Sequence, residues 1–197
     1  MRALLVHCHP DPASYSAALR DAAGAALRRA GHEVYLLDLY ATRFDPVLSP
    51  AERASYNADT ARNVAGVADH VARLRRAEAL VVVYPTWLYG PPAMLKGWLE
   101  RVWLPGVAFS VPRFKGDRVR GALTNIRVFV GITTSGAPWW WLRLIRDPGR
   151  SLFMRGLRPL FAAGCRARWL QLHSMNNATP ADRARFLARV DRALASL

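Results

Sequence analysis

The chain has 197 residues, of which 52% are hydrophobic and 21% are charged. This balance is typical of a packed globular protein and excludes a disordered tail or a linker. Cys8 and Cys165 are the only cysteines, too few for a disulfide framework or a four-thiolate zinc site. We therefore expect one domain over residues 1–197, and so few thiols indicate a reducing, cytoplasmic setting.

The net charge is unusual, because 28 lysines and arginines stand against 14 acidic residues, giving +14. Nucleic-acid-binding proteins share such an excess, but their basic residues gather on one helix or segment. Here arginines recur singly or in pairs from Arg2 to Arg192. We do not expect a nucleic-acid partner; anionic ligands, acidic partners or an anionic membrane surface fit the charge better.

The apolar segments are too short to cross a membrane or direct export. The longest uncharged stretch, residues 79–95, contains three prolines, whereas a spanning helix needs about 20 apolar residues. The apolar run at residues 3–6 ends at His7, well short of the roughly 7 to 15 residues of a secretory signal core. These features predict a soluble protein without an export signal.

Short β-branched segments alternate with helical patterns, which predicts an α/β sheet with crossover helices. The expected strands are residues 3–6, 34–37, 79–84, 128–132 and 167–172. Most of these strands are continuously apolar, as expected for strands that are buried on both faces. Right-handed crossovers then give a three-layer α/β/α sandwich, with a five-stranded parallel sheet in the flavodoxin-like order 2-1-3-4-5.

Five helices are expected to connect and follow these strands. The clearest helical patterns are residues 16–30, 64–76, 91–103 and a last helix capped by Thr179. Two longer connections, residues 40–49 and 104–121, have the length of functional or interface segments.

Ligands of such sheets bind beyond the carboxyl ends of the strands, which directs attention to the segment after the first strand. Ser14 and Ser16 lie where the next helix begins. Free backbone N–H groups, two hydroxyls and the positive helix end together predict a phosphate site, with His9 as a further donor. Alternatively, one serine is only an N-cap and His9 is a surface imidazole.

The segments after the third and fourth strands are suited to a flat heteroaromatic ring. Residues 84–90 place aromatic side chains around a proline and glycine turn. Residues 133–138 carry small side chains that allow backbone N–H groups to approach a ring. Alternatively, the aromatics fill the sheet edge and residues 133–138 form an ordinary turn. No metal site is expected, because adjacent strand residues such as His7 and Cys8 point to opposite faces.

Residues 84–103, YPTWLYGPPAMLKGWLERVW, resemble the strand, flavin loop and helix of flavodoxin-fold NAD(P)H:quinone reductases of the DT-diaphorase type and related bacterial NAD(P)H-dependent oxidoreductases. Residues 9–16, residues 38–40, the Phe109 region and residues 133–134 extend the resemblance in the same order. It implies a bound flavin, either FMN or FAD, with NAD(P)H as co-substrate. It further implies a ping-pong cycle, in which quinone, azo or nitro aromatic acceptors enter the pocket that NAD(P)H has left.

The resemblance also implies roles for individual residues. The flavin phosphate side would be bound by His9, Ser14, Tyr15 and Ser16. The ring would be cradled by Pro85, Thr86, Trp87, Leu88 and Tyr89, and its far edge contacted by Thr133, Thr134, Ser135 and Gly136. The protein would form a homodimer, with residues 104–121 at the interface.

One stretch departs from the family's pattern. Mammalian-type members carry a tyrosine and a histidine after the threonine loop that assist proton movement, whereas residues 139–147 here read WWWLRLIRD. We therefore name no catalytic residue. Tyr89, Trp139 and Trp140 are candidates to line the acceptor site, the tryptophans as an apolar lid; alternatively, the tryptophans pack in the core or a dimer interface.

Two other functions remain open. A one-electron flavodoxin-type carrier would share the fold and the flavin, but such carriers are typically acidic and this chain carries a charge of +14. A non-enzymatic flavin- or nucleotide-binding regulatory subunit of a membrane transporter would suit a basic surface facing the inner leaflet.

Overall fold

The computed structural model describes residues 1–112, 114 and 117–197. It contains a parallel five-stranded sheet in the order β2-β1-β3-β4-β5, as predicted. The strands are β1 (Arg2–His7), β2 (Glu33–Asp38), β3 (Ala79–Pro85), β4 (Val128–Thr134) and β5 (Arg166–Leu172). The central strands β3 and β4 are buried almost throughout, which explains their continuous apolar sequences.

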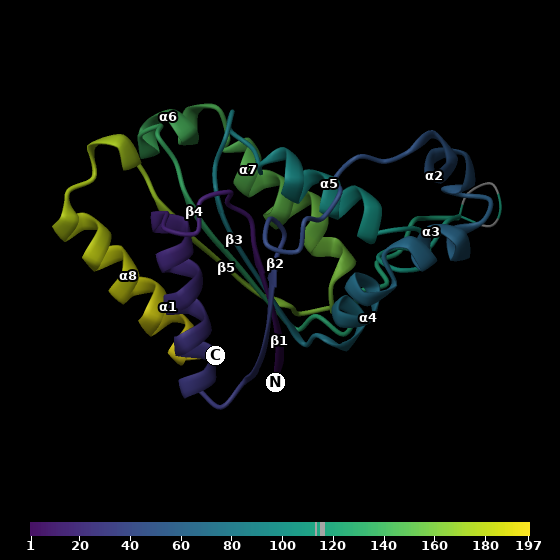
Figure 1. Ribbon diagram of the computed structural model, residues 1–197, viewed down its shortest axis with the longest axis horizontal. Coiled ribbons are helices and arrows are strands. Elements are labelled where there is room, and N and C mark those ends of the chain that lie inside the picture. Colours follow the sequence, from purple (N-terminus) through teal and green to yellow (C-terminus); the bar gives the residue numbers. More distant parts are fainter. Residues whose placement is uncertain (113, 115–116) are drawn as a thin grey trace.

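Helices cover both faces of the sheet, so the predicted three-layer sandwich is confirmed (Figure 1). The helices are α1 (Tyr15–Arg29), α2 (Pro50–Ser55), α3 (Thr60–Gly66), α4 (Ala68–Arg76), α5 (Ala93–Val102), α6 (Trp139–Leu144), α7 (Pro148–Ser151) and α8 (Pro180–Ala195). Shorter helical turns are η1 (Leu152–Leu157), η2 (Arg158–Leu160) and η3 (Met175–Asn177).

Two apolar clusters fill the spaces between the layers. On one face α1 and α8 pack against the sheet through side chains such as Leu27 and Val190. On the other face α4, α5 and η1 contribute Leu74, Trp98 and Phe153. Figure 1 shows α6 and the start of α1 near the edge of the sheet where the strands end, the edge at which ligands of such folds bind.

The expected helix over residues 64–76 is interrupted. Val67 has φ −134° and ψ 28°, so α3 ends at Gly66 and α4 begins one residue after the break. The apolar residues Val67, Val71 and Leu74 of this segment are nevertheless all buried in the core.

Two helical regions were not expected. Residues 139–157 form α6, α7 and η1 rather than a simple lid, and Asp147 begins α7 with a left-handed φ of 38°. The helix α2 follows the connection at residues 40–49, and its capping box joins Ser49 and Glu52. That Ser-Pro-Ala-Glu pattern is a sequence signal for a helix start.

The described ends of the segment at residues 104–121 pair with each other and lie against η2. Phe109 pairs with Gly121 in an isolated bridge. A side chain at Gly121 would meet the Cα of Leu160 at 2.5 Å, so only glycine permits this approach. Positions 113, 115 and 116, including Gly116 of the expected interface loop, lie outside the described residues. Within the described part of the chain, no helix has the length and apolar character needed to cross a membrane.

Candidate functional site

The segments that follow β1, β3 and β4 lie side by side. The backbone N–H of Cys8 donates to Val83 across 3.1 Å, and that of Thr86 donates to Thr134 across 2.8 Å. Ser135 in turn donates its N–H to Leu172 at the end of β5, across 2.9 Å. The carboxyl edge of the sheet therefore brings the three candidate loops together.

The first of these loops leads into the N-terminus of α1. Ser14 is the N-cap, and its hydroxyl accepts a hydrogen bond from the N–H of Ala17 at 3.2 Å. The N–H groups of Tyr15 and Ser16 belong to the first helical turn and have no acceptor within the helix. Ser14 is thus a helix cap, and it leaves donors at the positive end of α1 for an anion.

His9 links the start of α1 to the next loop. Its Nδ1 accepts a hydrogen bond from the N–H of Asp11 at 3.0 Å, and its ring lies 6.1 Å from that of Trp87, measured between centroids. Tyr15 is tied to α8 instead, since its hydroxyl donates to the carbonyl oxygen of Arg183 at 2.8 Å.

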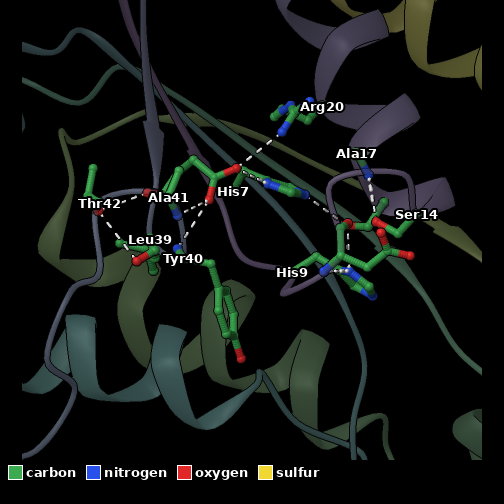
Figure 2. A network of polar contacts seen from close by, with 12 residues as sticks. His7, His9, Ser14, Ala17, Arg20, Leu39, Tyr40, Ala41 and Thr42 are labelled. Carbon is green, nitrogen blue, oxygen red and sulfur yellow. Dashed lines mark hydrogen bonds and ion pairs between the residues drawn. The ribbon is translucent and has the colours of Figure 1, made fainter.

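A buried polar network lies beneath this loop, and sequence reasoning missed its two central residues (Figure 2). His7 is fully buried, and its Nδ1 lies 2.8 Å from the Oδ2 of Asp38. Arg20 Nη1 donates to the same oxygen at 3.1 Å, and the N–H groups of Tyr40 and Ala41 donate to Oδ1.

The network fixes the protonation of both groups. Burial lowers the pKa of His7 despite the nearby carboxylate, so the ring is neutral at neutral pH. Burial alone would raise the pKa of Asp38, but the hydrogen bonds from Ala41, His7 and Arg20 outweigh it and hold that pKa below its usual value. His7 therefore carries its hydrogen on Nδ1 and presents a bare Nε2.

Ser16 faces this bare nitrogen. Its hydroxyl oxygen lies 3.4 Å from His7 Nε2, at the long limit of a hydrogen bond, and the residue is only 6% exposed. The Ser16 hydroxyl thus points into the network, and its backbone N–H is the group left for an anion.

The loop after β3 forms a tight turn from Trp87 to Gly90. The backbone N–H of each residue donates to the carbonyl of the other at 3.0 Å. Leu88 and Tyr89 between them have φ of 46° and 63°, a conformation that leucine and tyrosine rarely adopt. Leu88 is also 99% exposed. Strained, exposed apolar residues of this kind concentrate at ligand sites.

This turn forms one wall of a hollow of about 600 Å³, the ring pocket. Its lining residues are Thr86, Leu88, Tyr89, Ser135, Gly136, Ala137, Pro138, Trp140 and Trp141. The indole N–H of Trp141 donates to the Tyr89 hydroxyl at 3.0 Å, which joins α6 to the turn. An open pocket with aromatic walls and one backbone wall fits a planar heteroaromatic ring.

The structure divides the expected ring-binding residues into lining and supporting groups. Thr133 is fully buried, and its hydroxyl lies 3.0 Å from that of Thr86. Thr134 is also buried, so both threonines hold the loop from behind. Pro85 and Trp87 likewise flank the pocket without lining it.

The three consecutive tryptophans do not act as one lid. Trp140 and Trp141 line the ring pocket, whereas Trp139 lines a neighbouring groove on the other side of α6. Trp141 was not among the expected site residues, and the direction of each indole depends on where α6 begins, which the sequence does not reveal.

The site offers binding surfaces rather than a reactive side chain. Burial raises the pKa of Cys8 to about 12, so it is a neutral thiol and not a nucleophile. Among the described residues, no three histidine, cysteine or acidic side chains are grouped so as to hold a metal ion.

A parallel sheet of order 2-1-3-4-5, with a helix N-terminus and an aromatic-walled pocket at its carboxyl edge, is typical of the flavodoxin-like class. The chain belongs to the family described as having a flavodoxin-like fold, whose model matches residues 1–192.

Known relatives agree with this assignment. The chain is 32% identical over 151 residues to NAD(P)H dehydrogenase (quinone) 1 of Cavia porcellus, covering 69% of this chain and 54% of that protein. It is 28% identical to the solved structure of Smu.1420 from Streptococcus mutans UA159, with a TM-score of 0.86 over 100% of both chains. It is 26% identical to the NAD(P)H:quinone oxidoreductase from Methanothermobacter marburgensis, with a TM-score of 0.81 over 99% of this chain and 98% of that one. The chain spans 54% to 64% of the length of the mammalian relatives that it matches.

Proposed function

We propose that the protein is a flavin-dependent NAD(P)H oxidoreductase that reduces quinone-type, azo or nitro aromatic acceptors in a ping-pong cycle. The observation that carries this proposal is the convergence of three loops at one sheet edge, with free helix N–H groups beside an aromatic-walled pocket of about 600 Å³. The relatives named NAD(P)H dehydrogenase (quinone) and NAD(P)H:quinone oxidoreductase support the reaction class.

The residues present fit a flavin mononucleotide. The N–H groups of Tyr15 and Ser16, with His9 beside them, would bind the phosphate, and the turn at Leu88 and Tyr89 would hold the ring. A bound flavin supplies hydride transfer from NAD(P)H.

The protein's own residues would position the two planar partners and exclude water. Trp140 and Trp141 provide a flat apolar wall against which an aromatic acceptor can stack. Ser135 and Gly136 also line the pocket. Since the site holds no reactive thiol, catalysis would depend on orientation and electrostatics.

We further propose that the protein acts as a cytoplasmic homodimer, with residues 104–121 at the interface. Support comes from this segment itself, where Val111, Phe114 and Val119 expose apolar side chains to solvent. Exposed apolar patches of this kind commonly mark contacts between proteins.

The test is a titration of the purified protein with FMN and with FAD, followed by anaerobic addition of NADH or NADPH. We expect saturable quenching of flavin fluorescence at one flavin per chain, and loss of the yellow absorbance when the nucleotide is added. A protein that binds neither flavin would refute the proposal.

A further inference from the structure

A second groove, of about 690 Å³, lies on the other side of α6 from the ring pocket. It is bounded by α6, α7, η1, the edge strand β5 and α8. Its lining residues are Trp139, Leu142, Arg143, Arg146, Asp147, Arg150, Ser151, Arg155, Trp169, Gln171, His173 and Arg189. The proposed function assigns no role to this groove.

The groove is strongly positive. Five of its 12 lining residues are arginines, whereas lysine and arginine together make up 28 of the 197 residues of the chain. Asp147 is the one acid among them, and its carboxylate accepts the N–H of Arg150 at 3.1 Å to begin α7. Burial lowers the pKa of His173, so this ring adds no positive charge at neutral pH.

These five arginines outnumber the single acid of the groove, Asp147. None of the five makes an ion pair with an acidic side chain within the described part of the protein. Like charges on one concave surface repel one another, and a cleft concentrates their field on whatever enters it. Guanidinium groups suit phosphate because they donate two parallel hydrogen bonds to it.

A buried amide gives a second, independent sign of a ligand. Gln171 is only 8% exposed and lines the groove. Its Oε1 accepts the indole N–H of Trp169 at 2.8 Å, which assigns Nε2 as the free end. That Nε2 has no hydrogen-bond partner among the described residues. Buried polar groups are almost always paired, so an unpaired amide on a residue that lines the groove indicates a missing partner.

The walls of the groove are partly aromatic. Trp139 is exposed and Trp169 half-buried, and both line the groove together with Leu142. A concave site with aromatic walls and convergent guanidinium groups favours a small ligand over a nucleic-acid backbone or a membrane, which need an extended surface.

We propose that this groove binds a nucleotide through at least two of its phosphate groups, with the base against Trp139. The ligand is either the phosphate-bearing half of the dinucleotide co-substrate or a separate nucleotide. The inference does not depend on flavin binding, because none of the groove residues belongs to the start of α1 or to the turn after β3.

The experiment is calorimetric titration with adenosine 2′,5′-bisphosphate, and with adenosine as the uncharged control, on protein with and without FMN. The test variant is Arg146→Gln/Arg150→Gln. The matched control, Arg62→Gln/Arg192→Gln, removes the same charge at exposed arginines outside the groove. We expect saturable binding of the bisphosphate alone, weakened about tenfold or more in the groove variant and less than about twofold in the control.

Equal weakening in both variants would show attraction to the overall charge only, and would overturn the proposal, as would no binding to the wild-type protein. Retention on anionic vesicles or duplex DNA that is lost in the groove variant, without bisphosphate binding, would also overturn it.

Among supporting results, a larger rise in KM for NADPH than for NADH in the groove variant identifies the co-substrate as ligand. Unchanged KM values with lost bisphosphate binding identify a separate nucleotide. If the protein binds the bisphosphate but no flavin, the inference about the groove is supported and the proposed function is refuted.

Discussion

The buried ring of His7 donates its Nδ1–H to the carboxylate of Asp38 across 2.8 Å, which joins β1 to β2 directly beneath the start of α1. The pKa values of both groups are lowered in the folded protein. As the pH falls, the unfolded chain therefore binds more protons than the folded protein does. The free energy of unfolding must decrease as a result.

The His7→Gln variant tests this linkage. The free energy of unfolding of the wild type should fall between about pH 7.5 and pH 5.5, as unfolded histidine with a pKa of about 6.5 takes up a proton. The variant lacks this group, so its loss over the same interval should be smaller by up to about 1 kcal/mol. Denaturant unfolding at both pH values measures the difference, and identical pH dependence in the two proteins would contradict it.

A substitution at Leu88 should affect stability and ligand binding in different directions. Leucine at a φ of 46° is strained, so Leu88→Gly should leave the free energy of unfolding unchanged or raise it by up to about 1 kcal/mol. The same change removes an exposed apolar wall and should weaken flavin binding several-fold. Thermal unfolding and flavin titration report the two effects; a clear loss of stability would mean that the strain has been misjudged.

Neighbouring tryptophans provide a matched pair of variants for the acceptor site. Trp140 lines the ring pocket and Trp139 the neighbouring groove. With saturating NAD(P)H, Trp140→Ala should raise the KM for a quinone about tenfold, because stacking and apolar burial are lost. Trp139→Ala should change it less than about twofold. The reverse order would place the acceptor on the other side of α6.

Gly131 of β4 packs against the ring of Trp169, which lines the second groove. A side chain at Gly131 would meet the Trp169 ring at 2.2 Å, so Gly131→Ala should lower the free energy of unfolding by about 1 to 3 kcal/mol through overpacking. Gly66→Ala is the control, since an added Cβ there would have nothing within 4 Å and alanine favours the helix by roughly 0.5 to 1 kcal/mol. Chemical denaturation of both variants tests the contrast.

The proposed homodimer predicts that a charge at residues 104–121 dissociates it. Val119 is 57% exposed, and Val119→Glu should shift the protein from dimer to monomer in sedimentation velocity. Val47→Glu, a change at a similarly exposed valine outside the segment, should remain dimeric. A wild-type protein that sediments as a monomer would refute the dimer itself.

Sequence patterns predicted all five strands, and the general rules for right-handed crossovers in α/β sheets supplied the order that the structure confirms. The cap at Thr179 was equally readable, since its hydroxyl accepts the N–H of Asp182 as the sequence pattern predicts. The break at Val67 was not predictable, because the helical pattern of apolar residues continues through it.

The site was partly predictable for a similar reason. The loops after β1, β3 and β4 follow from the sheet topology, and the positions of Ser14 and Leu88 followed with them. The pairing of His7 with Asp38 depends on strand register between β1 and β2. Local sequence carries no signal for a contact between residues so distant in the chain.

The arginines that line the second groove are all exposed to solvent. Trp169 and Gln171, which also line it, belong to the edge strand β5. Selectivity there can consequently be rewritten by exchanging solvent-facing residues one at a time, with little penalty to folding. Such a division would let related proteins diverge in what they bind at this groove while the ring pocket stays unchanged.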